Sequence, residues 1–292
     1  MDSKFLPNYP RPKGYIDTPA GRLPYFIYGQ GRPIFIFNGF TCCQYNLKRI
    51  INNLKSKYKI VSLDYIGHGL ADNPKDLQHI TIQDFIEDSK KVIEATKLDK
   101  PILLGYSMGA QLMFEYIRQN PENASGLISL NGTMGRAFDN FFKTDLVSHL
   151  LINQHLHPIR ELTEFLWKAM TRVPFNIQFF FASFFFLDKK KCKYDDIYPF
   201  LNQLKDIDEA LLVELANKMH IHNSLPYLEQ INQQTLFLAG EWDMFTPLVC
   251  SKKAHEKMPN SELVVIPKGT HNTVMERYDF ISSQIDKYIS NI

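Results

Sequence analysis

The 292-residue sequence has little cysteine, little glycine and almost no excess of charge of either sign. Four cysteines at the irregular positions 42, 43, 192 and 250 cannot supply a disulfide framework or the closely spaced ligands of a zinc site, so we expect free thiols. Thirty-three basic and 31 acidic residues give a net charge of +2, which excludes the broad basic surface that nucleic-acid binding requires. We expect no metal ion, cofactor or nucleic-acid partner.

The sequence also lacks an apolar run at its beginning. Prolines stand at positions 7, 10 and 12, where a signal peptide would have its hydrophobic stretch, so we expect neither secretion nor a membrane anchor and place the protein in the cytoplasm. Two triplets, beginning at Asn123 and Asn131, match the N-glycosylation pattern, which has no meaning without secretion, and we discount both. With 45% apolar and 22% charged residues, the composition is that of a globular protein.

Short and long apolar segments alternate through the first 133 residues and again after about residue 228. Short runs predict strands at residues 22–28, 33–37, 58–63, 101–104, 126–130, 235–239 and 263–266, the first two joined by a tight turn. Segments with helical spacing predict helices at residues 45–57, 81–96, 107–119, 249–257 and 273–289. This alternation predicts an α/β fold, a mostly parallel twisted sheet with helices on both faces.

Residues 134–228 interrupt the alternation. This third of the chain holds 12 of the 22 phenylalanines, and its apolar spacing is helical throughout. Residues 175–187 contain seven Phe and are followed by three lysines, but the run is shorter than the about 20 residues that span a membrane. We predict a helical insertion, folded onto a core formed by residues 1–133 and 229–292.

A candidate nucleophile lies between a strand and a helix. Residues Gly105–Gly109 read Gly-Tyr-Ser-Met-Gly and follow the apolar strand ending at residue 104. In a nucleophile elbow the serine stands on a sharp, strained turn, and flanking residues without a Cβ atom let the strand and the helix approach closely. The position of the motif therefore predicts Ser107 as a nucleophile, with Gly105 and Gly109 as the elbow glycines.

A serine hydroxyl needs a base to take its proton, normally a histidine oriented by a carboxylate. Asp243 and His271 each follow an apolar strand, in the chain order that this arrangement uses after the serine. We predict His271 as the base and Asp243 as its acidic partner, with Glu241 and Asp139 as alternatives for the acid.

The oxyanion that forms during acyl transfer needs backbone N–H donors, one from the residue after the nucleophile and one from an earlier loop. Met108 would supply the first. The loop that begins at Asn38 would supply the second from Phe40, because Gly39 permits a tight backbone path. The amide of Asn38 would orient this loop.

Five motifs together resemble the α/β-hydrolase fold superfamily, of the kind with a helical cap. They are Asn38–Phe40, Asp64–Asp72, Gly105–Gly109, Gly240–Asp243 and Gly269–His271, and they cover essentially the whole chain in the family's order. The family usually has His-Gly at the oxyanion loop, where this chain has Asn-Gly. Serine at the nucleophile position argues against the dehalogenase and epoxide-hydrolase branches, which use aspartate there.

The resemblance implies a serine hydrolase that cleaves an ester or a thioester with an apolar group, residues 134–228 forming a cap that shapes the pocket. Acyl transfer by the same triad and ligand binding with little turnover remain the alternatives. The Phe-rich helix is equally well accounted for by packing against the core, and contact with a lipid surface beside its lysines is a lesser alternative. The sequence leaves the acyl length, the leaving group and the oligomeric state open.

Overall fold

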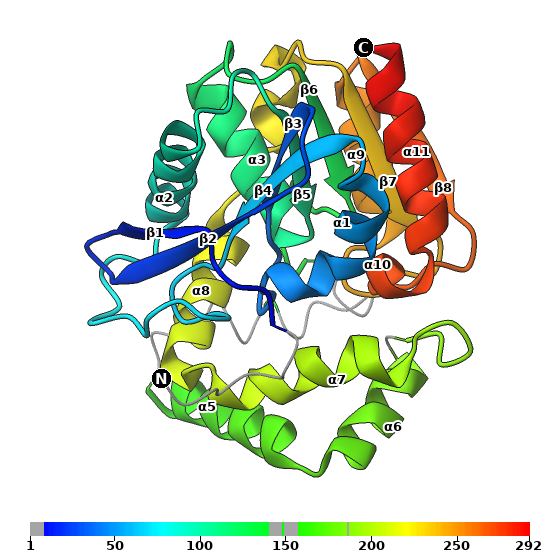
Figure 1. Ribbon diagram of the computed structural model, residues 1–292. Coiled ribbons are helices and arrows are strands. Elements are labelled where there is room, and N and C mark those ends of the chain that lie inside the picture. The colour runs from blue at the N-terminus through cyan, green and yellow to red at the C-terminus, as the bar shows by residue number, and fades with distance from the viewer. Residues whose placement is uncertain (1–8, 140–147, 149–156, 186) are drawn as a thin grey trace.

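The computed structural model describes residues 9–139, 148, 157–185 and 187–292, whose eight strands form one sheet in the order β1-β2-β4-β3-β5-β6-β7-β8 (Figure 1). The strands are β1 (Gly14–Asp17), β2 (Arg22–Tyr28), β3 (Arg32–Phe37), β4 (Tyr58–Leu63), β5 (Ile102–Tyr106), β6 (Gly126–Leu130), β7 (Thr235–Gly240) and β8 (Ser261–Ile266). Strand β2 pairs antiparallel with both β1 and β4, and β4, β3, β5, β6, β7 and β8 pair in parallel. The predicted mostly parallel sheet is confirmed.

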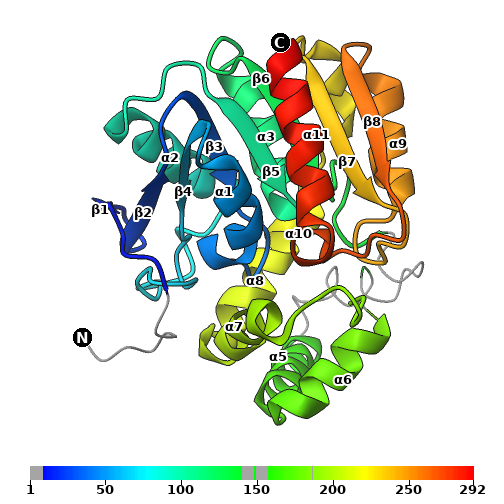
Figure 2. The ribbon, with the colours of Figure 1, turned by 45° about the vertical axis from the view of Figure 1, so that its right-hand side comes forward.

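Helices cover both faces of the sheet. They are α1 (Lys48–Leu54), α2 (Ile82–Ala95), α3 (Met108–Gln119), α9 (Leu248–Lys257), α10 (Thr273–Glu276) and α11 (Tyr278–Asn291). Helices α1 and α11 pack together on one face, and α2, α3 and α9 lie on the other (Figures 1 and 2). Thr81 caps α2 by accepting a hydrogen bond from the Asp84 N–H, which explains why this helix begins where the sequence predicted.

Strands β2 and β3 are joined by the short turn that the sequence predicted, in which Gly29 and Gly31 have positive φ, and β4 pairs with both strands and lies between them. Two details differ from the sequence prediction. Strand β1 was missed, since four residues with one buried side chain, Ile16, give no periodic signal. The single helix expected at residues 273–289 is broken at Arg277, whose φ of −131° is not helical.

Between β6 and β7, every described element is helical. These inserted helices are α5 (His157–Arg172), α6 (Phe175–Phe185), α7 (Tyr194–Gln203) and α8 (Glu209–Ile221), with short 3₁₀ turns at Leu204–Asp206 and Leu225–Gln230. Helices α5, α6 and α7 lie beyond the carboxyl ends of the parallel strands (Figures 1 and 2). No helix in the described ranges combines the length and the apolar character needed to cross a membrane.

Polar contacts attach the inserted segment to the core. Asp196 of α7 accepts two hydrogen bonds from the Arg49 guanidinium, at 2.8 and 3.0 Å. Asp188 lies on the loop that precedes α7. It forms an ion pair with Arg277, between α10 and α11, at 2.9 Å. Because these charged groups are partly or fully withdrawn from water, the pairs fix the position of α7 against the core more firmly than exposed ion pairs would.

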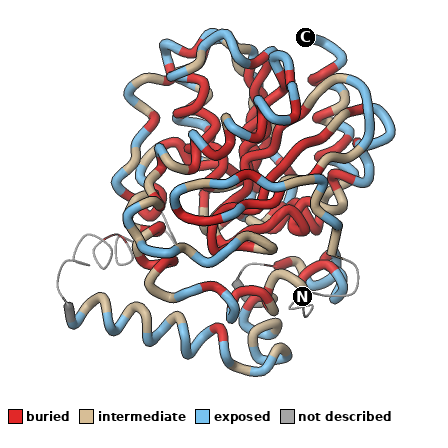
Figure 3. The backbone as a smooth tube through the Cα atoms, turned by 60° about the vertical axis from the view of Figure 1, so that its left-hand side comes forward, coloured by how far each residue is buried: buried red, intermediate tan, exposed pale blue. Residues whose placement is uncertain are grey.

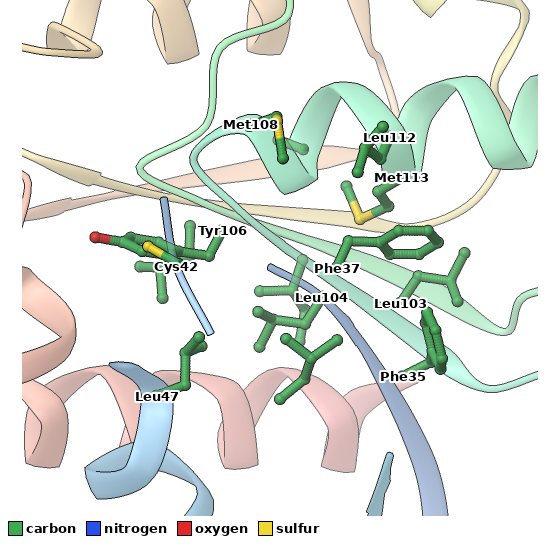
Figure 4. Packing of buried hydrophobic residues seen from close by; sticks show 14 of the residues in the cluster. Phe35, Phe37, Cys42, Leu47, Leu103, Leu104, Tyr106, Met108, Leu112 and Met113 are labelled. Carbon is green, nitrogen blue, oxygen red and sulfur yellow. The ribbon is translucent and has the colours of Figure 1, made fainter. Parts of the chain in front are cut away.

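Part of the hydrophobic core lies between α3 and the central strands. Figure 4 shows Phe35 and Phe37 of β3 beside Leu103 of β5 and Met113 of α3, and all four side chains are buried. Strand β5 is buried along its whole length, as a central parallel strand should be. This packing holds the β5–α3 junction rigidly, and the predicted nucleophile lies at that junction.

The buried Glu115 of α3 makes a pH-dependent contribution to stability. Burial alone would raise its pKa, but hydrogen bonds from Arg118, Tyr227 and Gln119 outweigh burial and lower the pKa to about 2. A depressed carboxyl pKa stabilises the folded state above the unfolded pKa of about 4.3, and this contribution is lost as the pH falls toward 2.

We expect Glu115→Gln to lower the free energy of unfolding at pH 7 by about 2 kcal/mol, discounted for the exposure of Arg118. The deficit relative to the wild type should shrink between pH 4.5 and pH 2, because protonation removes the same charge from the wild type. Urea unfolding at several pH values measures this difference in the free energy of unfolding. Glu122→Gln, at an exposed glutamate, is the control. A deficit independent of pH would contradict the electrostatic explanation.

Candidate active site

Ser107 occupies the turn between β5 and α3 in a strained backbone conformation. Its φ is 54° and its ψ is −118°, a region that residues with a side chain rarely adopt. The Ser107 N–H donates to the Leu130 carbonyl at 3.0 Å, which ties the turn to the end of β6. The turn therefore presents the serine at the carboxyl edge of the sheet, as a nucleophile elbow does.

The two glycines of the motif permit this turn. A Cβ atom on Gly105 would lie 2.6 Å from the Cα atom of Ala110, in the first turn of α3. A Cβ atom on Gly109 would overlap the Phe37 carbonyl and lie 2.9 Å from the Asn38 carbonyl oxygen. Since real Cβ atoms do not approach backbone so closely, only glycine lets α3 start against β3 and β5.

The structure brings the three residues of the predicted triad together. The Nε2 atom of His271 lies 3.0 Å from Oγ of Ser107, and its Nδ1 atom lies 2.8 Å from Oδ2 of Asp243. The Asp243 side chain is fully buried, whereas the His271 side chain is 14% exposed. A hydroxyl, an imidazole and a carboxylate thus form one hydrogen-bonded chain at the ends of β5, β8 and β7.

Backbone donors hold the Asp243 carboxylate in place. Its Oδ1 atom accepts the N–H groups of Phe245 at 2.8 Å and Thr246 at 2.9 Å. The Thr246 hydroxyl lies 2.8 Å from Oδ2, the oxygen that faces His271. These contacts leave the carboxylate one orientation, in which Oδ2 points at the imidazole.

The loop predicted to supply the second oxyanion donor lies directly beside Ser107. A Cβ atom on Gly39 would lie 3.2 Å from the Cβ atom of Ser107. The Cys42 N–H donates to the Gly39 carbonyl at 3.2 Å and closes a turn that contains Phe40. Met108 is the first residue of α3, where N–H groups have no partner within the helix. Both predicted donors therefore belong to segments that adjoin the serine.

The alternatives for the acid lie elsewhere. Glu241 is exposed, and its Oε2 atom accepts the Lys268 N–H at 2.9 Å. Asp139 has a side chain that is 43% exposed and accepts a hydrogen bond from Ser148 at 3.2 Å. Of these three acids, Asp243 is the one with an ion-pair distance to His271 in the described structure.

Two segments of the chain match models of known protein families. Residues 32–156 match a family model described as alpha/beta hydrolase fold, and residues 216–291 match a second model described as TAP-like protein. The chain belongs to the α/β-hydrolase fold superfamily. The resemblance inferred from the motifs is thereby confirmed, and the sheet order agrees with it.

Relatives within this superfamily share the architecture at low sequence identity. A pimeloyl-(acyl-carrier protein) methyl ester esterase of Legionella pneumophila (strain Corby) is 22% identical over 262 residues, covering 90% of this chain and 97% of the relative. The solved structure of an esterase from Exiguobacterium antarcticum superposes with a TM-score of 0.76 at 20% identity, covering 94% of this chain and 98% of that one. A meta-cleavage product hydrolase from Pseudomonas fluorescens superposes with a TM-score of 0.74 at 17% identity, covering 96% and 98%.

One feature departs from the usual α/β-hydrolase pattern. Asn38, in place of the usual histidine, is fully buried and donates through Nδ2 to the Leu63 carbonyl at 2.7 Å. This contact links the oxyanion loop to the end of β4. The side chain therefore has a structural role, which agrees with the prediction that its amide orients the loop.

The two thiols beside this loop belong to the core of the α/β-hydrolase domain. Cys42 and Cys43 are both buried, and Figure 4 shows Cys42 against Tyr106. Burial, followed in size by the nearby Asp64 carboxylate, raises the pKa of Cys43 to about 12. A thiol with so high a pKa stays protonated at neutral pH, so it is a poor nucleophile. None of the four cysteines, all within the described ranges, forms a disulfide, as expected.

Asn131 is the residue of this site that the sequence analysis missed. It is buried, and its Nδ2 atom lies 2.8 Å from the His271 carbonyl and 2.8 Å from the Thr273 hydroxyl. Its Oδ1 atom accepts the Gly240 N–H at 3.0 Å. One amide thus joins the loop that carries Asp243 to the loop that carries His271. The sequence showed only a glycosylation triplet, which burial of the amide makes irrelevant.

We expect Asn131→Ala to destabilise the protein by about 3 kcal/mol, because several buried polar groups lose their partner. Any ester hydrolysis should fall about tenfold through kcat more than through KM, since the two loops lose their common anchor. Thermal unfolding and steady-state kinetics measure these changes. Asn123→Ala, at the exposed asparagine of the other triplet, is the matched control for the kinetics and should leave kcat and KM unchanged.

Proposed function

We propose that this protein is a serine hydrolase that cleaves a carboxylic ester or thioester through an acyl-enzyme. The Ser107 hydroxyl attacks the substrate carbonyl carbon while His271 Nε2 accepts the hydroxyl proton. The tetrahedral oxyanion accepts hydrogen bonds from the N–H groups of Met108 and Phe40. Collapse of this intermediate breaks the bond to the leaving group, which receives the proton from His271.

Water completes the cycle. His271 Nε2 removes a proton from the water molecule that attacks the acyl carbon, and the second tetrahedral intermediate releases the acid and returns the proton to Ser107. Asp243 accepts a hydrogen bond from the Nδ1–H group of His271 throughout, so that Nε2 remains the basic nitrogen. This chemistry uses only side chains and backbone groups of the chain.

The observation that carries the proposal is the hydrogen-bonded chain from Ser107 through His271 to Asp243. Its two distances, 3.0 and 2.8 Å, are those of competent hydrogen bonds, and the serine stands in the strained turn that defines an elbow. Membership of the α/β-hydrolase superfamily supports hydrolysis as the reaction. The esterase among the curated relatives supports an ester as the substrate class.

We further propose that residues 134–228 act as a cap over the site and select an apolar acyl group. Support comes from Gln203 at the end of α7, whose Nε2 atom donates to the Thr41 carbonyl at 2.9 Å within the oxyanion loop. The Phe-rich helix α6 supports this proposal less, because Phe180 and Phe181 face solvent. The side chains that line the acyl pocket are therefore expected on the core-facing side of the cap.

A fluorophosphonate probe followed by mass spectrometry tests the proposal. We expect one adduct at Ser107 and hydrolysis of p-nitrophenyl esters that depends on acyl length. Absence of an adduct in the folded protein would contradict catalysis and favour a ligand-binding role.

Product analysis with added alcohols separates hydrolysis from acyl transfer, because a transferase forms a new ester in place of the free acid. A matched thioester series identifies the preferred leaving group.

A further inference from the structure

Helix α5 has its apolar side turned away from the protein. Its exposed large side chains, between 50% and 64% accessible, are Leu162, Phe165, Leu166 and Met170. Their spacing of three and four residues places them on one face of the helix. The opposite side carries the buried Thr171 and the ion pair of Arg160 with Glu164. A surface helix normally shows the reverse arrangement, so this face needs an apolar partner outside the chain.

Helix α6 also exposes large apolar side chains. Ile177, Phe180 and Phe181 are 41%, 64% and 55% exposed. We call the seven side chains on the two helices the α5–α6 apolar face. They are seven of the fifteen large apolar residues that are exposed in the described structure, within twenty consecutive positions. So many exposed large apolar side chains in one short segment are typical of an interaction surface.

The α5–α6 apolar face lies at an outer edge of the molecule. Figures 1 and 2 place both helices on the side away from the amino ends of the parallel strands, and Figure 3 shows the exposed positions along them. The face is therefore accessible to a large, flat partner, and the carboxyl ends of the strands, with Ser107, lie on the same side of the sheet.

The segment that carries the face is rich in basic residues. Residues 157–193 contain seven Lys or Arg and three Asp or Glu, a formal net charge of +4, whereas the whole chain carries only +2. Lys168 and Arg172 on α5 and the run Lys189–Lys191 after α6 are all exposed. This segment therefore concentrates positive charge beside apolar side chains, which is the composition of a helix that lies on an anionic lipid surface.

We propose that the α5–α6 apolar face docks the protein onto the surface of an anionic lipid bilayer. The Phe, Leu and Met side chains enter the boundary between headgroups and acyl chains, and the flanking lysines and arginines contact headgroup phosphates. A second copy of this chain fits the face less well, because a symmetric contact would bring two positively charged surfaces together. The proposal goes beyond the hydrolase function and does not depend on it.

Docking through this face would turn the carboxyl edge of the sheet toward the bilayer. The inserted helices contact the oxyanion loop through Gln203 and Thr41, so the docked segment is continuous with the site. A substrate with a long apolar chain would then pass from the membrane to Ser107 with little exposure to water.

Flotation with lipid vesicles tests the proposal on the full-length protein. The probes are vesicles of phosphatidylcholine and phosphatidylglycerol in equal parts, and vesicles of phosphatidylcholine alone. We expect flotation with the anionic vesicles, at least about tenfold weaker binding to the neutral ones, and weakening by salt. The double variant Phe165→Ser/Phe180→Ser should reduce anionic binding at least about tenfold.

Two control variants sharpen the result. Phe280→Ser removes an apolar side chain of α11, 37% exposed and outside the face, and should bind as the wild type does. Ser107→Ala should also bind normally, so a failed hydrolase proposal would leave this one standing. Failure of the wild type to float with anionic vesicles would overturn the inference. A dimer by light scattering that becomes monomeric in the double variant would assign the face to a second copy instead.

Discussion

The Ser107→Ala variant is expected to lose ester hydrolysis by at least about 10⁴-fold in kcat while keeping the wild-type fold. The hydroxyl lies at hydrogen-bond distance from His271 Nε2 at the end of β5, and no acyl-enzyme can form without it. Alanine accepts the same backbone angles as serine, so the strain of the turn at φ 54° is unchanged. Steady-state hydrolysis of a short p-nitrophenyl ester and thermal unfolding measure the two effects.

Ser290→Ala is the matched control for this experiment. Its hydroxyl donates to the Asp286 carbonyl within α11, far from the site along the chain, and its loss should leave kcat within about twofold. Substantial turnover by folded Ser107→Ala would exclude the acyl-enzyme. A large drop in melting temperature for Ser107→Ala would instead indicate that the hydroxyl stabilises the turn.

The sequence predicted the fold well because the central strands are buried on both faces. β4 and β6 were predicted with the bounds that the structure has, since a short, mostly apolar run between turn residues is typical of a buried strand. Polar residues that directly follow such strands must gather at the carboxyl edge of a parallel sheet. That rule identified Ser107, Asp243 and His271 as candidates, and the structure brings them within hydrogen-bond distance.

Asn131 was missed because its partners are distant in sequence. The His271 carbonyl and the Gly240 N–H lie 140 and 109 positions away along the chain, and both are backbone groups, which no residue pattern reveals. The only available signal was a polar residue directly after β6, at the edge where the site residues lie. The strand-end rule that located the triad would have selected Asn131 as well.

The orientation of α5 was also beyond the sequence. Apolar periodicity predicts a helix with one apolar face, and α5 has that face. Periodicity fixes the angles among side chains but not which side of the helix contacts the protein. The usual assumption that the apolar side faces inward favoured a buried or ligand-lining role for the Phe-rich insertion, with contact to a lipid surface as the lesser alternative. In the structure Phe165 and Phe180 are exposed instead, and this exposure motivates the bilayer proposal.

The Asp243→Asn variant is expected to lower kcat for ester hydrolysis by about 10⁴-fold. The carboxylate accepts a hydrogen bond from the Nδ1–H group of His271, with 2.8 Å between Nδ1 and Oδ2, and so keeps Nε2 free to accept the Ser107 proton. The backbone N–H groups of Phe245 and Thr246 occupy Oδ1, so the amide oxygen of asparagine takes that position and its NH₂ group faces His271. The imidazole then carries its proton on Nε2 and can no longer act as the base.

Glu241→Gln, two residues earlier in the same loop, separates this mechanism from a general loss of negative charge. Glu241 is exposed and accepts the Lys268 N–H, so its neutral form should leave kcat within about twofold. Comparable losses in the two variants would mean that the charge of the loop, and not the tautomer of His271, determines the rate. A raised rate of Asp243→Asn at high pH, where hydroxide can remove the serine proton, would support the tautomer mechanism, because the remaining elbow and oxyanion donors are unchanged.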